Sequence, residues 1–167
     1  MFEIFPYNHH TIIMDNKHQK IVINAIKDIF KELCIPIDRI EIKKESNRIN
    51  EIITNIGISG NLKGNFLMLS NLKSAKHITA HLLNRSSIPH SEDSFDEIDK
   101  ATFGELANQL SARVVMHYSE NNIDCTITPP TIITGKNVKS LIFGLTEFFY
   151  SNIIGQFGYI DLLFGIK

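Results

Sequence analysis

The sequence contains few of the residues that mark specialised protein classes. Its 167 residues include two cysteines, five prolines and no tryptophan. The two cysteines, Cys34 and Cys125, have no paired spacing, which argues against a disulfide framework or a zinc site and favours a reducing compartment. The first ten residues lack a basic start followed by an apolar run. We therefore expect no signal peptide and a cytoplasmic location.

The sequence also lacks a charge excess and a long apolar run. The formal net charge is −1, and no basic run offers the positive face that a nucleic acid requires. No apolar stretch approaches the roughly 20 residues of a membrane-spanning helix. We therefore expect neither a nucleic acid nor a membrane as partner. With 43% hydrophobic and 21% charged residues, the chain is typical of one globular domain with a sizeable core.

The most informative stretch is residues 94–118, which has the apolar period of a long helix. Its apolar face consists of Phe103, Leu106, Ala107, Leu110 and Val114. Its opposite face, within about 60° of arc, consists of Ala101, Glu105, Asn108 and Ala112. A carboxylate and a carboxamide thus lie one turn apart between methyl groups, where a second protein surface can lie flat. We expect Ser94 or Asp93 to cap this helix, with Glu97 completing a capping box behind Ser94.

The rest of the chain is predicted to contain two more helices and several strands. The predicted helices are residues 18–33, which Pro36 ends, and residues 72–83. The predicted strands are 37–42, 49–59, 65–69, 123–128, 131–134, 140–150 and 158–166. The predicted connections are loops at 43–48 and 84–92, a hairpin turn at 60–64, a turn at 135–137 and a link near 152–156.

This order of elements decides the fold class. A helix followed by strands occurs twice, at residues 18–69 and 94–166, which favours an α+β domain over βαβ alternation. We assign residues 18–167 to this domain, with long helices packed on an antiparallel sheet. Residues 1–17 form either a strand or an arm docked on the domain.

Glu105 and Asn108 are the main candidates for chemistry. A carboxamide can hold an attacking water by donating and accepting at once, and a carboxylate can anchor a lysine or accept a proton. Neither is a nucleophile, and no His or Ser shares their face, so a partner would have to complete an active site. The alternative is two ordinary solvated residues at i, i+3 spacing.

Other polar groups have simpler interpretations. His77 and His81 have the spacing that lets two imidazoles share a metal ion, but two ligands are too few. We interpret both as surface residues, together with His9, His10 and His18. The acidic residues at the start of the long helix, Asp96, Glu97 and Asp99, are explained by the helix dipole.

Four segments of the chain, taken together, resemble the CheX-type chemotaxis phosphatases, relatives of CheC and FliY. The matching segments are GISGNLKGNFLMLS, GELANQLSA, ITPPTIITGKN and GYIDLLFGI, so that the resemblance runs from about residue 49 to the end. It implies a phosphatase that hydrolyses the aspartyl phosphate of a CheY-like response-regulator receiver domain, and a homodimer. Residue 101 is commonly Asp or Ser in this family and residue 112 commonly Gly, whereas both are Ala here.

The resemblance also implies a role for each site residue. Asn108 would orient the attacking water, Glu105 would pair with the receiver lysine, and Ala101, Gln109 and Ala112 would form the docking face. The receiver would bring Mg²⁺, and this chain would bind no cofactor of its own. The first helix has only Asp28-x-x-Lys31 where two-site relatives carry a second Glu-x-x-Asn, so we expect at most one site per chain. The alternative is a non-catalytic CheX-like module that binds a receiver or another signalling protein through the same face.

Overall fold

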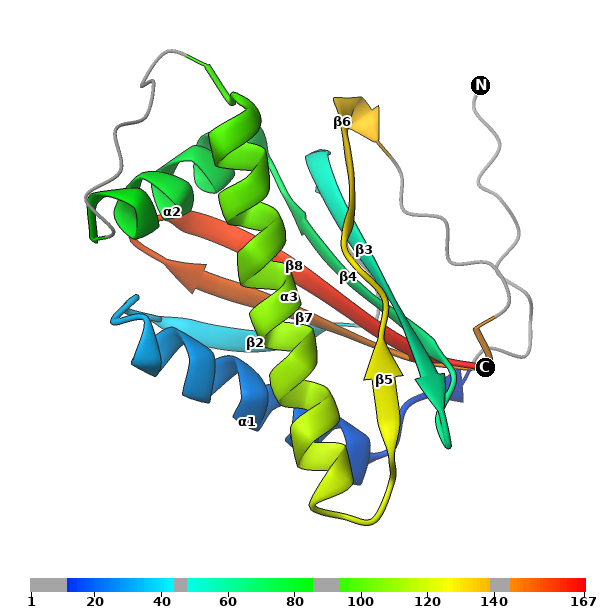
Figure 1. The fold of residues 1–167 in the computed structure, drawn as a ribbon. Coiled ribbons are helices and arrows are strands. Elements are labelled where there is room, and N and C mark those ends of the chain that lie inside the picture. The colour runs from blue at the N-terminus through cyan, green and yellow to red at the C-terminus, as the bar shows by residue number, and fades with distance from the viewer. Residues whose placement is uncertain (1–11, 44–47, 86–93, 139–144) are drawn as a thin grey trace.

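The computed structural model describes residues 12–43, 48–85, 94–138 and 145–167. These residues form three helices that cover one face of a single sheet (Figure 1). The helices are α1 (Asn16–Glu32), α2 (Leu72–Arg85) and α3 (Glu97–Ser119). The strands are β1 (Ile12–Ile13), β2 (Arg39–Lys43), β3 (Asn50–Gly60), β4 (Gly64–Ser70), β5 (Cys125–Ile127), β6 (Thr131–Val138), β7 (Glu147–Gly155) and β8 (Gly158–Ile166). The predicted α+β class is therefore confirmed.

The sheet is antiparallel except at one short edge. Its strand order is β1-β7-β8-β4-β3-β5, with β2 also paired to β7 and β6 also paired to β3. Only β1 pairs in parallel among the described strands. β8 lies between β4 and β7, and β7 is covered on its other side by β1 and β2. Neither β7 nor β8 therefore lies at a free edge of the sheet.

Each face of the central strands packs against a different apolar cluster. Side chains that alternate along a strand point to opposite faces. In β8, Ile160, Leu162 and Phe164 join the core beneath the helices, whereas Leu163 joins a second cluster on the other face. The near-continuous apolar sequence of β8 follows from this burial on both sides.

The prediction for β7 placed this strand too early in the sequence. Residues 151–155 belong to the strand, and only Gln156 and Phe157 link it to β8. Asn152 looked like a turn residue, but it is 1% exposed and its side-chain amide donates to the carboxylate of Asp161 on β8. A buried partner across the sheet thus places an asparagine inside a strand. Residues 140–144 of the predicted strand lie outside the described residues.

The turn predicted at residues 135–137 is also wrong. These residues continue β6, which pairs Val138 with Asn50 and Thr134 with Ile52. The register therefore shifts so that residues 135–137 lie opposite Glu51 alone. A bulge of this kind favours glycine and other residues that tolerate distorted backbone, which explains why the segment looked like a turn.

The first helix ends before Pro36 is reached. Its last turn closes through Ile35 N–H, which donates to Phe30 C=O at 2.8 Å, and Cys34 N–H, which donates to Lys31 C=O at 3.0 Å. Cys34 has a φ of +53°, the left-handed conformation that ends many helices. The backbone reversal at Cys34, rather than the proline, therefore ends the helix.

Other predicted elements agree with the structure. The helices predicted at 18–33 and 72–83 correspond to α1 and α2, and the hairpin turn at 60–64 joins β3 to β4. Of the predicted N-terminal arm, the structure describes residues 12–17, which contribute β1 and the first two residues of α1. Within the predicted loops, residues 44–47 and 86–92 lie outside the described part of the chain.

Candidate functional site

The start of α3 is fixed by a capping box at Asp96. The Asp96 carboxylate accepts from the backbone N–H groups of Ile98 and Asp99, each at 2.9 Å, and the Asp99 carboxylate accepts from Asp96 N–H at 3.2 Å. Our prediction of Ser94 and Glu97 as the box is therefore wrong by two residues. Asp93, the other predicted cap, is not among the described residues. An acidic pair three residues apart satisfies the same backbone donors as the predicted Ser–Glu pair.

Polar contacts attach α3 to the helix on each side. Near its start, the buried carboxylate of Asp99 accepts from Thr79 Oγ1 of α2 at 2.8 Å. Near its end, Arg113 Nη2 donates to Glu32 of α1 at 2.8 Å. His117 Nε2 lies 2.9 Å from the Asp28 carboxylate, also on α1. These contacts restrict both the tilt and the rotation of α3.

The apolar face of α3 packs on the sheet as predicted. Phe103, Leu110 and Val114 are fully buried. Gly104 permits a close approach to β6, because a Cβ at this position would lie only 2.8 Å from Ile132 Cδ1. Sequence analysis did not single out this glycine, although it opens the segment GELANQLSA. Its close packing fixes the backbone directly before Glu105.

The opposite face of α3 is open to solvent. Ala101, Glu105 and Ala112 are exposed and Asn108 is half-buried, which confirms the predicted two-sided helix. The two alanines leave the pair without bulky neighbours at the turn before and the turn after it. A flat surface can therefore reach both polar groups together.

Glu105 is held by two side chains of its own helix. One carboxylate oxygen accepts from Gln109 Nε2 at 3.2 Å, and the other lies 3.5 Å from Asn108 Nδ2, a long contact. Asn108 Oδ1 accepts no hydrogen bond from any described residue and remains available to a water molecule. Sequence analysis placed Gln109 on the docking face but missed its bond to Glu105, which the i, i+4 spacing could have indicated.

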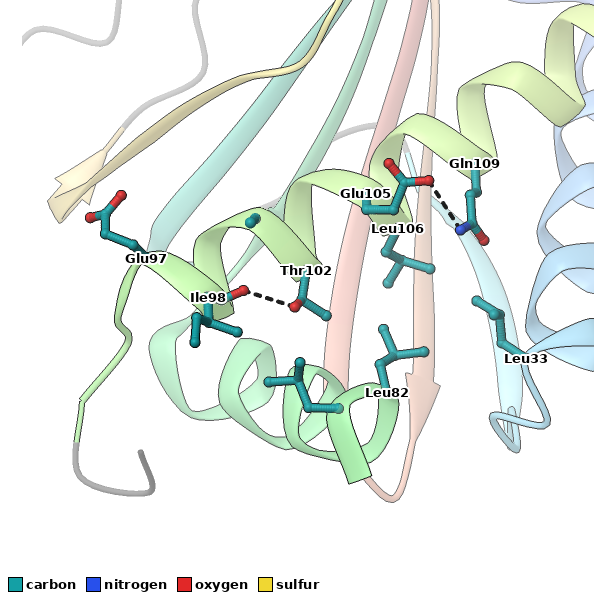
Figure 2. A pocket seen from close by; sticks show the side chains of 10 residues that line it. Leu33, Leu82, Glu97, Ile98, Thr102, Glu105, Leu106 and Gln109 are labelled. Atoms are coloured by element: carbon teal, nitrogen blue, oxygen red, sulfur yellow. Dashed lines mark hydrogen bonds between the residues drawn. The ribbon is translucent and has the colours of Figure 1, made fainter. Parts of the chain in front are cut away.

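A groove of about 520 Å³ lies beside this pair, between α2, α3 and the end of α1. Figure 2 shows Leu82 of α2 and Leu33, which caps α1, facing Leu106 on α3. Glu105 and Gln109 lie at one end of the groove, and Ile98 lies toward the other. The pair is thus continuous with a largely apolar depression.

The remaining candidate residues do not assemble a second site. His77 and His81 are exposed on α2, and no group of three or more His, Cys, Asp or Glu among the described residues is placed to hold a metal ion. His18 is not the simple surface residue that we expected, because its Nδ1 lies 2.6 Å from the hydroxyl of the buried Tyr118. His9 and His10 lie outside the described residues.

The sequence matches a family model described as chemotaxis phosphatase CheX over residues 52–144, more than half of the chain. The chain belongs to the CheX family. A curated relative, the CheY-P phosphatase CheX of Thermotoga maritima, is 24% identical over 96 residues. That match covers 58% of this chain and 59% of the relative, so the match spans less than two thirds of the relative's length.

Solved structures of other proteins share this fold. A CheC-like superfamily protein from a Shewanella species superposes with a TM-score of 0.77 at 15% identity, covering 92% of this chain and 99% of that one. CheX in a CheX–CheY–BeF3–Mg²⁺ complex from Borrelia burgdorferi superposes with a TM-score of 0.71 at 18% identity, covering 90% and 97%. At such identities the likeness shows the fold. No helix in the described part of the chain is long and apolar enough to span a membrane.

Proposed function

We propose that this CheX-family chain hydrolyses the aspartyl phosphate of a CheY-like receiver domain. The observation that carries the proposal is the placement of Glu105 and Asn108 side by side on the open face of α3. The Thermotoga relative is named as a CheY-P phosphatase, and the Borrelia complex joins a CheX to CheY. Both names support a receiver as the partner.

In the proposed reaction, Asn108 positions the attacking water. The water oxygen bonds to phosphorus, the bond from phosphorus to the aspartyl oxygen breaks, and aspartate leaves as a carboxylate. The proton lost by the water passes to the phosphate product. Asn108 Oδ1, which accepts no hydrogen bond from the described residues, would accept from this water, and such positioning is a major part of catalysis in phosphoryl transfer.

Glu105 would fix the position of the docked receiver relative to Asn108. Its carboxylate is exposed, and Gln109 restricts its rotation. A receiver lysine that reaches this carboxylate forms a charge-assisted hydrogen bond, which is stronger than a neutral one. Because Asn108 lies one turn away, this contact would set the distance between the carboxamide and the phosphorus.

The receiver would bring its Mg²⁺ together with the phosphoaspartate. One carboxylate and one carboxamide on α3 are a sparse ligand set for a metal that usually also binds phosphate oxygens and water. The metal, when present on the receiver, neutralises charge on the phosphoryl oxygens. We further propose that the chain acts as a homodimer, as the resemblance implies.

The test compares matched alanine variants on phosphorylated receivers from the source organism. We expect Asn108→Ala to lower kcat by about 100- to 1000-fold, the loss typical of one preorganised polar group. Its fold and its receiver affinity should change little, because substitutions at such solvent-facing positions cost about 0.5 kcal/mol or less. Asn24→Ala is the control, because Asn24 is an exposed asparagine on α1.

Glu105→Ala should weaken docking and turnover together. Equal turnover by Asn108→Ala and the parent would contradict the mechanism. A parent that binds the phosphorylated receiver without speeding loss of phosphate would instead indicate the non-catalytic binding module.

A further inference from the structure

The groove beside Glu105 has no role in the proposed hydrolysis itself. Its floor is apolar, with Leu83 and Leu106 almost fully buried, and its walls include the half-buried Leu33 and Leu82. Ile98 on its rim is 44% exposed and therefore accessible to a partner. An open apolar depression of this size can receive an apolar group of a partner.

The charges of the groove restrict what can occupy it. All charged residues among its described lining are acidic, namely Glu97 and Glu105. They lie eight residues apart on α3, about 12 Å along the helix axis. Glu97 is highly exposed and pairs with Lys100, but surface pairs of this kind are weak and exchange readily. An occupant with a basic group at each end would therefore be favoured over an acidic one.

The groove lies next to Glu105, and this position indicates which partner can occupy it. Glu105 belongs to both the proposed catalytic pair and the groove, so a receiver docked on the pair lies against at least one end of the groove. We propose that the groove receives an apolar side chain of the same phosphorylated receiver, with a basic receiver residue near Glu97. This inference rests on the proposed function. It assigns Ile98 and Leu82 to selection of the partner rather than to the chemistry.

The separation of roles follows from geometry. Ile98 lies seven residues before Glu105, two turns along nearly the same line of the helix, and therefore does not reach the phosphorus. A contact made equally in the bound and transition states changes affinity without changing kcat. The groove residues should therefore affect Kd and KM, whereas Asn108 affects kcat.

The experiment measures affinity and turnover separately. Ile98→Gln and Leu82→Gln remove apolar surface from the groove, and Leu72→Gln is the matched control because Leu72 is 40% exposed at the opposite end of α2. Each variant is titrated with a receiver loaded with beryllofluoride and Mg²⁺, a stable mimic of the phosphorylated state. We expect Kd and KM to rise about tenfold in both groove variants, as for an interface anchor, with kcat unchanged. The control should match the parent.

A charge reversal at Glu97 tests whether a basic residue of the receiver lies near this carboxylate. Glu97→Lys should raise Kd further than Glu97→Gln, and the difference should shrink at high salt because exposed charges are screened. Unchanged Kd in both Ile98→Gln and Leu82→Gln, while Glu105→Ala weakens binding, would overturn the inference and leave the proposed function standing. If the parent binds a receiver without hydrolysing its aspartyl phosphate, the proposed function fails. The Kd values of the groove variants then still show whether the groove contacts the receiver. A parent that binds no receiver overturns both.

Discussion

Asp99 links α3 to α2 through a buried hydrogen bond, and its replacement should destabilise the protein measurably. Its carboxylate is 1% exposed and accepts two hydrogen bonds, from Thr79 Oγ1 at 2.8 Å and from Asp96 N–H at 3.2 Å. The first bond joins two helices and the second closes the capping box. Asp99→Ala removes both.

The cost of Asp99→Ala can be worked out from these contacts. A hydrogen bond to a charged group contributes about 1.5–3 kcal/mol, and a helix cap about 1 kcal/mol. The higher helix propensity of alanine offsets up to about 0.7 kcal/mol of this loss in the free energy of unfolding. Thr79 Oγ1 keeps a contact with Lys76 C=O at 3.2 Å, so its hydroxyl is not left without an acceptor. We expect a net loss of about 2–3 kcal/mol, which for a chain of this size lowers Tm by about 5–10 °C.

The assay is urea and thermal unfolding followed by circular dichroism, because the chain has no tryptophan. Glu97→Ala is the control, since its carboxylate lies in the same helical turn but is 88% exposed, and it should cost less than about 1 kcal/mol. Thr79→Val should cost little more once Asp99 is already alanine, because the shared bond has gone. Equal destabilisation by Asp99→Ala and Glu97→Ala would refute the reasoning.

Three further predictions concern the site, the helix pair and the assembly. Gln109→Leu should raise the KM for a phosphorylated receiver severalfold without lowering Tm, because it frees the Glu105 carboxylate; an unchanged KM would contradict the positioning role. Burial opposes protonation of His117, but hydrogen bonds to Glu120 and Asp28 outweigh it and raise the pKa of His117 above its ordinary value. A raised pKa means that protonation stabilises the fold at low pH and that this contribution is lost as the pH rises, so His117→Gln should destabilise more at about pH 6 than at about pH 9 in urea titrations. Light scattering at micromolar concentration should give a mass near twice the 19.0 kDa of one chain, and a strict monomer would contradict the proposed dimer.

The helix faces were predictable because their signal is local. The spacing of Phe103, Leu110 and Val114 sets the buried side of α3 and leaves Glu105 and Asn108 on the open side. Each of these assignments depends only on residues within a few turns. The predicted faces of α3 agree with the structure because they depend on this local spacing alone.

The misassigned segments depend on partners far away in the sequence. Asn152 belongs to a strand because Asp161 accepts its hydrogen bond across the sheet, and neither residue alone predicts that pairing. Residues 135–137 form a bulge because β3 continues past them, which their own composition does not show. The central position of β8 likewise depends on pairing with both β4 and β7. Sequence composition indicated strands here but could not give their neighbours.

Asp28 on α1 and Glu105 on α3 differ in the contacts that they make. The resemblance to the CheX-type phosphatases implies that Asp28-x-x-Lys31 of α1 takes the place of a second Glu-x-x-Asn pair. The Asp28 carboxylate lies 2.9 Å from His117 Nε2 and 3.7 Å from Arg113 Nη1, so two residues of α3 already occupy it. A partner that bound Asp28 would have to compete with contacts that hold α1 against α3. Asp28 thus helps to hold α1 against α3, whereas the contacts of Glu105 with described residues come from Asn108 and Gln109 of its own helix and leave its carboxylate open to a partner.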